Sequence, residues 1–260
     1  MKLLLVDIGN SRVKWAWVRD GRLGRQRAAA NAQWQVHDYA RRLIGGNWRP
    51  GSRIVVSSVA GADVDRIFVR AARAVSAPSP EFFASRRTVA GVKTAYLEPW
   101  RLGVDRLAGA IGARHLARGR PVCLVNVGTA ITIDVVDQGG RHRGGAIIPG
   151  PPMMVASLLR DTSGIRRRAQ GGARGVQTLF ARTTRTAIAQ GSRYAAAAVI
   201  DRAILEARRV LGRRPAVFLT GGGLPAVKPL LRVASVTVPD LVLVGLAVWA
   251  GQSPLGRRVN

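Results

Sequence analysis

The polar segment that starts at Asp7 is the first part of the chain whose residue types and spacing could do chemistry. It reads Asp-Ile-Gly-Asn-Ser and follows a run of apolar residues, with Lys14 three positions beyond it. A carboxylate at the end of a strand can hold a hydrated Mg²⁺ ion, and Gly9 lets the backbone approach a ligand closely. Asn10, Ser11 and Lys14 carry groups that bind phosphate oxygens. Because these are also ordinary turn residues, the segment alone indicates a phosphate site only weakly.

A second copy of this segment strengthens the indication. At a constant offset of 119 residues and without a gap, Asp7 aligns with Asn126 and Gly9 with Gly128. Each copy has an apolar stretch, a glycine-containing turn and a second stretch rich in β-branched residues, which predicts a β-hairpin. Two such turns facing each other would form a cleft suited to a polyphosphate. The repeat therefore predicts two related lobes, residues 1–118 and 119–260.

The usual nucleotide fingerprints are missing from the chain. There is no G-x-x-x-x-G-K-[ST] and no G-x-G-x-x-G after a strand. Any ATP site must therefore be of another kind.

Asp105 and Arg106 form a second candidate site. Pro99 and Gly103 keep the preceding residues irregular, and the apolar spacing from Leu107 predicts a helix with Asp105 at its start. Asp105 could simply cap that helix, or it could accept a proton from a substrate hydroxyl while Arg106 pairs with a substrate carboxylate or phosphate. The helix terminus and the arginine both favour the ionised carboxylate, so Asp105 would be a weak base. A weak base suffices in a loose phosphoryl-transfer transition state.

Strands and helices that alternate along the chain must position these residues. In the first half, the patterns predict strands at 2–6, 13–18 and 52–59 and helices at 31–42 and 63–75. In the second half, Thr183 and Thr184 are expected to cap a long helix. This alternation predicts α/β lobes.

Composition limits the class of protein. The 260 residues include one cysteine, Cys123, which excludes an internal disulfide and any Cys-rich zinc site. The apolar N-terminal run is interrupted too early, at Asp7, for a signal peptide or a membrane span. We expect a cytoplasmic protein without a membrane partner.

The net charge of +27 has two interpretations. It could attract nucleic acid, or it could reflect a GC-rich coding bias, since only four of the 41 basic residues are lysine and the arginines are spread along the chain. No zinc-finger, basic-zipper or RNA-binding signature accompanies the charge. The second interpretation is favoured, and a nucleic-acid partner is not expected.

Together, the motifs resemble one known family. The chain is similar to type III pantothenate kinases, which include Bvg accessory factor proteins, within the acetate and sugar kinase, heat-shock and actin superfamily. The resemblance extends over nearly the whole chain through seven motifs in the family's order: D-I-G-N-S at 7–11, Y-x-x-P…G-V-D-R at 96–106, V-N-V-G-T-A at 125–130, G-G-A-I-I-P-G at 144–150, T-x-x-A-I-x-x-G at 184–191, T-G-G at 220–222 and L-V-L-V-G-L at 241–246.

The resemblance implies ATP-dependent phosphorylation of pantothenate to 4′-phosphopantothenate, the first step of coenzyme A biosynthesis. It implies two ribonuclease-H-like, actin-like lobes with a nucleotide cleft between them, and a homodimer whose second subunit completes the pantothenate pocket, with Thr184 acting in trans. Asp105 would be the base and Asp7 would lie near Mg²⁺, through water. The implied ATP-binding residues are Asp7, Ile8, Gly9, Asn10, Ser11, Arg12, Val13, Lys14 and Thr129. The implied pantothenate-binding residues are Tyr96, Gly103, Val104, Asp105, Arg106 and Thr184.

Three positions depart from the family's pattern. Asn126 stands where the family usually has an aspartate that binds a monovalent cation, so dependence on K⁺ or NH₄⁺ is left open. Ser11 replaces the commoner threonine and keeps the hydroxyl group. Val104 replaces the commoner alanine and could tighten the pocket.

Two other classes of function are weighed against the kinase. A regulatory or nucleic-acid-associated protein would use the basic surface. An actin- or chaperone-like ATPase would use the cleft for conformational switching, but the chain has no evident peptide-binding domain, and the 103–106 segment supplies substrate chemistry that such a switch does not need.

Overall fold

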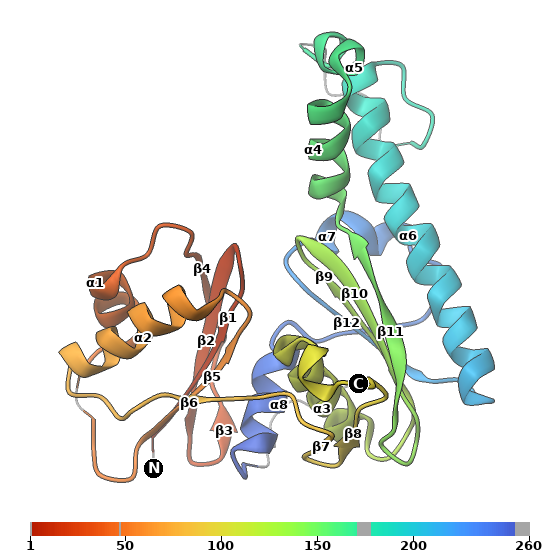
Figure 1. Ribbon diagram of the computed structural model, residues 1–260. Helices are drawn as coiled ribbons and strands as arrows, with labels where there is room; N and C mark the ends of the chain where they lie inside the picture. The colour runs from red at the N-terminus through yellow and green to blue at the C-terminus, as the bar shows by residue number, and fades with distance from the viewer. Residues whose placement is uncertain (1, 47, 171–177, 253–260) are drawn as a thin grey trace. The chain divides into compact units, whose positions relative to one another are not determined.

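The computed structural model describes residues 2–46, 48–170 and 178–252 and contains two compact units (Figure 1). The first unit comprises Met1–Arg120, Val136–Gly144 and Asp240–Asn260, and the second comprises Pro121–Val135 and Gly145–Pro239. The lobes expected at 1–118 and 119–260 stay a prediction. The first unit includes residues 136–144 and 240–260, although both ranges fall within the predicted second lobe.

The sheet of the first unit contains the hairpin that begins the chain. In the described residues its strand order is β3-β2-β1-β5-β6, with β4 also paired to β2. The strands are β1 Leu3–Ile8, β2 Arg12–Arg19, β3 Arg22–Leu23, β4 Arg27–Ala30, β5 Arg53–Ser58 and β6 Glu81–Phe82. The predicted strands at 2–6, 13–18 and 52–59 are therefore confirmed.

Both faces of this sheet are covered by helices, because alternate residues of a strand point to opposite sides. Leu4, Val6 and Ile8 pack in a core with α1 (Val36–Tyr39), the π-helix η1 (Ala40–Ile44) and α2 (Ala62–Ala74). Leu3 and Leu5 pack on the other face with α3 (Val104–Ala117) and α8 (Leu241–Trp249). Asp7 shares the spacing of Leu3 and Leu5, so it lies on the face covered by α3.

Helices α3 and α8 cross at two glycines. A Cβ atom on Gly112 would meet the carbonyl oxygen of Leu241, and one on Gly245 would meet the carbonyl oxygen of Ala108. The absence of side chains at both positions lets the two backbones approach closely. This packing fixes α3, which carries Asp105 at its first turn.

The helix predicted at 31–42 is wrong for its first five residues. Strand β4 ends at Ala30, Asn31 lies in a turn, and α1 begins only at Val36. The cause is tertiary, because the backbone and side chain of Asn31 both bond to the turn that follows β1. Three short elements complete the first unit: β7 Thr88–Val89, β8 Val92–Lys93 and the 3₁₀-helix η2 Pro99–Arg101.

The sheet of the second unit has the strand order β11-β10-β9-β12-β13. These strands are β9 Val122–Val127, β10 Ala130–Val136, β11 His142–Pro149, β12 Ala216–Thr220 and β13 Val236–Thr237. Its helical elements are α4 Pro151–Asp161, α5 Ser163–Arg168, α6 Thr184–Leu211, α7 Leu224–Val227 and the 3₁₀-helix η3 Lys228–Leu230. The apolar stripe of α6, including Ile200 and Ile204, packs with Val125 and Val127 of β9.

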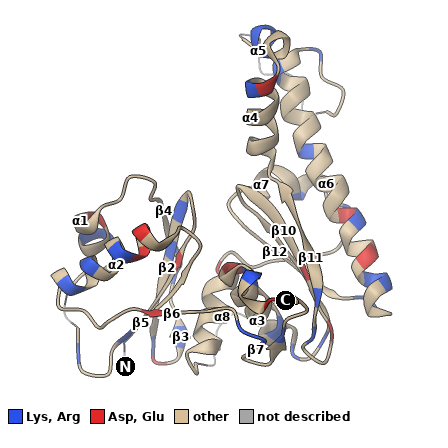
Figure 2. Ribbon diagram, in the orientation of Figure 1, with Lys and Arg blue, Asp and Glu red and all other residues tan. Residues whose placement is uncertain are grey.

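The charged side chains follow the prediction of a spread distribution. Lys and Arg occur on helices and strands of both units (Figure 2). In the described ranges, no helix has both the length and the apolar character needed to cross a membrane.

Candidate active site

Asp7 is a buried carboxylate with a nearby cation. It is 6% exposed, and its Oδ2 atom lies 3.5 Å from Nζ of Lys14, the residue opposite it in the antiparallel pair β1–β2. Burial raises the pKa of Asp7 above its ordinary value, and the charge of Lys14 partly opposes that rise. Ser57 is opposite Asp7 in the parallel pair β1–β5.

The turn after β1 presents polar groups next to this carboxylate. The N–H of Gly9 donates to the carbonyl oxygen of Arg12 at 3.0 Å and closes the turn. Asn10, Ser11 and Arg12 are exposed. Two of the expected ATP-binding residues, Ile8 and Val13, have buried side chains, so only their backbone atoms could contact a nucleotide.

Asn31 is a residue of this site that the sequence did not indicate. Its Nδ2 donates to the carbonyl oxygen of Gly9 at 3.3 Å, and its backbone N–H donates to that of Ser11 at 3.4 Å. Twenty-two positions separate Asn31 from Gly9, and no motif links them. Pairing of β4 with β2 brings Asn31 to the turn.

The start of α3 holds the second set of predicted residues. Oδ1 of Asp105 accepts a hydrogen bond from the N–H of Arg106 at 2.8 Å, and a Cβ atom on Gly103 would lie 2.8 Å from the same oxygen. Gly103 therefore leaves room for the carboxylate. Val104 begins the helix.

Arg106 is buried against Tyr96. It is 6% exposed, its Nη1 donates to the Tyr96 hydroxyl oxygen at 2.8 Å, and its guanidinium carbon lies 5.7 Å from the Tyr96 ring centroid. Hydrogen bonding and stacking hold the planar guanidinium in one orientation. Such a fixed cation suits recognition of a carboxylate.

The structure brings the two predicted centres together within the first unit. Asp105 lies close enough to Asp7 for its negative charge to add to the rise in the pKa of Asp7. A carboxylate beside a phosphate-type turn thus neighbours a carboxylate beside a buried arginine. The residue types and their placement fit phosphoryl transfer to a hydroxyl group of an anionic substrate.

Asn126 and Thr129 lie in the second unit at the turn that repeats the first. This turn is closed by the N–H of Gly128, which donates to the carbonyl oxygen of Ala130 at 3.0 Å, so it is one residue shorter than its counterpart. Thr129 is exposed, and its carbonyl oxygen accepts from the N–H of Gly150 at 2.9 Å. Oδ1 of Asn126 lies 2.6 Å from the place a Cβ atom would take on Gly221, where φ is +103°.

Thr184 also lies in the second unit, as the first residue of α6. The preceding Thr183 caps the helix, since its Oγ1 accepts from the N–H of Thr186 at 3.2 Å. Thr184 lines a hollow of about 570 Å³ that includes Leu158 and Ile188. The expectation that threonines begin this helix is confirmed.

Asp7 and the turn beside it suit a hydrated Mg²⁺ ion better than a metal ion that is held entirely by protein side chains. Among the described residues, no three His, Cys, Asp or Glu side chains cluster as a metal site. Mg²⁺ keeps several waters and typically uses one or two carboxylates together with substrate phosphates. Asp7, a hard oxygen ligand beside the turn, matches that requirement.

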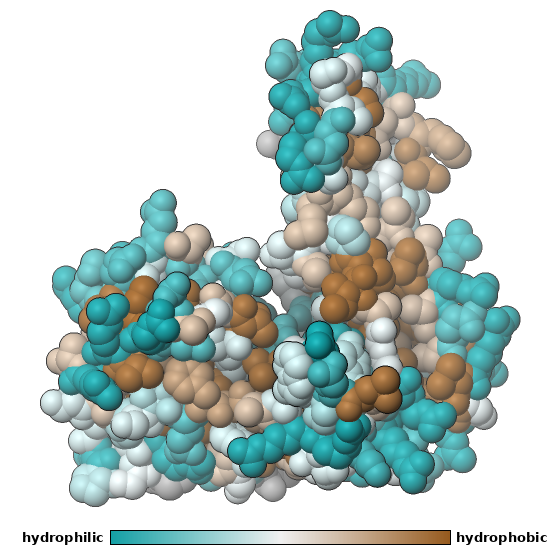
Figure 3. All heavy atoms as spheres, in the orientation of Figure 1, coloured by the Kyte–Doolittle hydropathy of each residue, from teal (hydrophilic) through white to brown (hydrophobic). Residues whose placement is uncertain are grey.

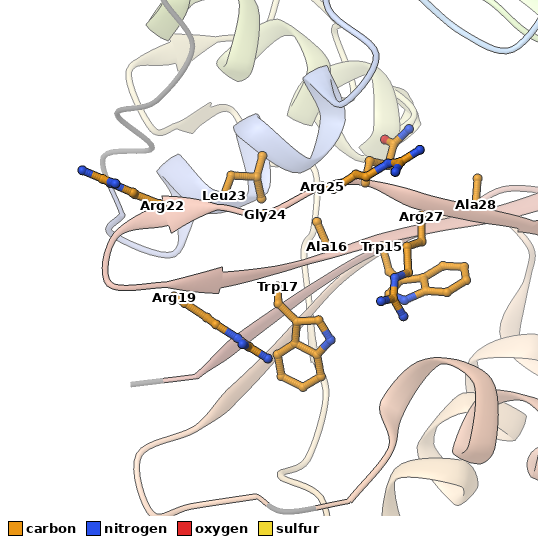
Figure 4. Close-up of a pocket in the computed structure, with 11 residues that line it drawn as sticks. Trp15, Ala16, Trp17, Arg19, Arg22, Leu23, Gly24, Arg25, Arg27 and Ala28 are labelled. Carbon is orange, nitrogen blue, oxygen red and sulfur yellow. The ribbon is translucent and has the colours of Figure 1, made fainter.

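A groove of about 790 Å³ lies elsewhere, at the edge of the first sheet. Figure 4 shows Arg19 next to Trp17 and Arg27 next to Trp15 in this groove. None of the predicted site residues lines it.

Comparison with solved structures identifies the fold class. A structure of a Baf family protein from Campylobacter jejuni superposes with a TM-score of 0.58 at 16% identity, covering 96% of this chain and 98% of that one. The PilM–PilN type IV pilus biogenesis complex gives a TM-score of 0.53 at 10% identity, covering 98% and 99%. These likenesses support the predicted mixed α/β, actin-like fold.

Sequence comparison gives the family. The type III pantothenate kinase profile matches residues 3–206. Type III pantothenate kinases from Nitrosococcus oceani and Stenotrophomonas maltophilia are 35% and 36% identical, covering 98% and 97% of this chain and 96% and 98% of the relatives. The chain belongs to the type III pantothenate kinase family.

Proposed function

We propose that the protein transfers the γ-phosphoryl group of ATP to the primary hydroxyl of pantothenate, giving 4′-phosphopantothenate for coenzyme A biosynthesis. The observation that carries the proposal is the proximity of Asp7 and Asp105 in one compact unit. The first lies beside a phosphate-type turn and the second beside a buried arginine. Family membership agrees with this chemistry.

The turn and Lys14 would hold the nucleotide. The exposed Asn10, Ser11 and Arg12 offer donors to phosphate oxygens, and the exposed Thr129 is proposed to bind ATP as well. Asp7 would hold Mg²⁺ through water, and the ion would neutralise charge that develops on the phosphates. Because Mg²⁺ favours an ionised ligand, a bound ion would oppose the rise that burial causes in the pKa of Asp7.

Arg106 and Tyr96 would hold pantothenate by its carboxylate. The hydroxyl oxygen forms a bond to the γ-phosphorus as the bond from that phosphorus to the ADP oxygen breaks. Asp105 receives the hydroxyl proton. Asp105 lies in the first turn of α3, and the loose transition state requires alignment more than early deprotonation.

Pantothenate-dependent ADP formation by the purified protein tests the proposal. We expect turnover with Mg²⁺ and pantothenate together and none when either is left out. Asp105→Asn should lower kcat about 100-fold, the usual contribution of a general base. Absence of turnover in every salt would overturn the kinase, and full activity of Asp105→Asn would remove Asp105 from the role of base.

The monovalent cation requires a separate experiment. The side chain of Asn126 is neutral. Its carbonyl oxygen could coordinate K⁺ or NH₄⁺, but it would not supply the negative charge of an aspartate. We expect a smaller increase of rate by K⁺ over Na⁺ in the natural protein than in Asn126→Asp. Equal responses of the two proteins would show that position 126 does not control cation use.

A homodimer is the proposed working form, with Thr184 reaching the partner's pantothenate pocket. In support, helices α4 and α6 and the segment before α6 expose large apolar side chains, and the hydrophobic surface there is visible in Figure 3. These residues are Met153, Leu158, Leu179, Phe180 and Val199. Sedimentation tests the assembly: the natural protein should sediment as a dimer, and Leu158→Glu, which places a charge on this apolar surface, should weaken the dimer. The proposed setting of the enzyme is the cytoplasm.

A further inference from the structure

We propose that Asn31 is a positioning residue that holds the turn after β1 in the conformation in which the Asn10 N–H faces the nucleotide phosphates. The proposal rests on the function proposed above, since it assigns this turn to ATP. It concerns a residue outside the motifs that carry the family resemblance.

The contacts of Asn31 surround Asn10. The side-chain Nδ2 donates to the carbonyl oxygen of Gly9, the residue before it, at 3.3 Å. The backbone N–H donates to the carbonyl oxygen of Ser11, the residue after it, at 3.4 Å. Asn31 is itself 6% exposed, whereas Asn10 is exposed.

These contacts fix the direction of the peptide between Gly9 and Asn10. In a planar trans peptide the carbonyl group and the following N–H point in opposite directions. Because the Gly9 oxygen is directed to Asn31, the Asn10 N–H is directed away from it. Among the backbone hydrogen bonds of the described turns and loops, none is donated by this N–H. It is thus available to a phosphate oxygen, as N–H groups of phosphate-binding turns are.

The amide of Asn31 is anchored in the core. Its Nδ2 also donates to the hydroxyl oxygen of Tyr39 at 3.3 Å. Tyr39 is fully buried, with its ring centroid 5.1 Å from that of Trp34 and 5.4 Å from that of Phe68. Asn31 therefore links this buried aromatic cluster by hydrogen bonds to a turn that exposes Asn10, Ser11 and Arg12.

The state of the Asn31 Oδ1 atom indicates that the two hydrogen bonds donated by Nδ2, to Gly9 and to Tyr39, set the orientation of the side chain. Oδ1 of Asn31 is buried and has no hydrogen-bond partner in the described structure. A buried acceptor without a partner is destabilising. The unpartnered Oδ1 lowers the stability of the fold, while the Nδ2 atom keeps its hydrogen bond to Gly9. This combination is expected for a residue that positions a binding turn.

Kinetics and nucleotide binding of Asn31→Ala test the proposal. We expect the Kd and KM for Mg·ATP to rise about tenfold, as for loss of one hydrogen bond in the complex. The KM for pantothenate should change less than twofold. Asn31→Asp, which keeps the shape of the side chain but not the donor, should raise the Mg·ATP values at least as much.

Tyr39→Phe is the matched control. It removes the other partner of the Asn31 amide but leaves both bonds to the turn, so the Kd for Mg·ATP should stay within twofold of the natural protein. An equal rise in Tyr39→Phe would mean general loss of core support and would overturn the proposal, as would an unchanged Kd in Asn31→Ala. Thermal melts confirm that each variant is folded.

The natural protein separates the two hypotheses. If it binds Mg·ATP but forms no ADP with pantothenate, the proposed function fails while the Kd values of the variants still decide the role of Asn31. If it does not bind Mg·ATP, both are overturned.

Discussion

Removal of the Lys14 charge should change the pH dependence of the enzyme. Lys14→Met keeps the stem of the side chain and deletes the cation 3.5 Å from Oδ2 of Asp7. At that distance two unit charges interact by about 1 kcal/mol in water and about 5 kcal/mol at an effective dielectric constant of 20. Burial and Asp105, which both raise the pKa of Asp7, would then act without the opposing charge of Lys14, so that pKa should rise further.

The expected result is a shift of the acid limb of the pH–rate profile. Asp7 binds Mg²⁺ when ionised, so kcat/KM for Mg·ATP should begin to fall at a higher pH in Lys14→Met than in the natural protein. If Lys14 also binds a phosphate, its removal lowers the rate equally across this range, so the position of the limb reports the ion pair.

Stability should follow the same titration. Because the pKa of Asp7 is raised above 3.8, the folded state binds more protons, and stability falls as pH rises through the window from 3.8 to the raised value. In Lys14→Met the window should extend further upward. Chemical denaturation at several pH values measures this dependence.

Lys93→Met is the matched control for the Lys14 variant. Lys93 is exposed on β8 in the same compact unit, so its loss alters net charge equally without deleting the neighbour of Asp7. An acid limb that stays in place in Lys14→Met, or that moves as far in Lys93→Met, would refute the reasoning.

Three further predictions concern single residues. Arg106→Lys should raise the KM for pantothenate about tenfold or more with little change in that for ATP, because lysine cannot reproduce the planar stacking on Tyr96; steady-state kinetics measure both. Gly245→Ala should lower the free energy of unfolding by about 1–3 kcal/mol by overpacking the α3–α8 crossing, whereas Gly222→Ala, with open space around it, should not; denaturant titration compares them. Burial raises the pKa of the Cys123 thiol to about 12, so thiol reagents should label the protein at pH 8 only after unfolding, as mass spectrometry can show.

Local patterns determined much of the first unit. The apolar run before Asp7 and the alternation from Val13 to Val18 are sufficient for β1 and β2, since both signals lie within a few residues. The start of α3 followed from Pro99, Gly103 and the apolar spacing after Asp105. These predictions succeeded because the signals for these strands and for this helix start lie within a few neighbouring residues.

Long-range contacts decided the rest. The local pattern predicted a helix at Asn31. Instead, β4 pairs with β2 up to Ala30, and this pairing brings the amide of Asn31 within hydrogen-bonding distance of the Gly9 carbonyl oxygen. Likewise, the approach of Asp105 to Asp7 and the burial of Arg106 on Tyr96 depend on the packing of α3 against the sheet. The sequence by itself predicted residues that could carry the chemistry, because charge and hydrogen-bonding capacity belong to residue types. Only the tertiary structure decided which of them are buried, adjacent and held in one orientation, because those properties arise from residues distant in the chain.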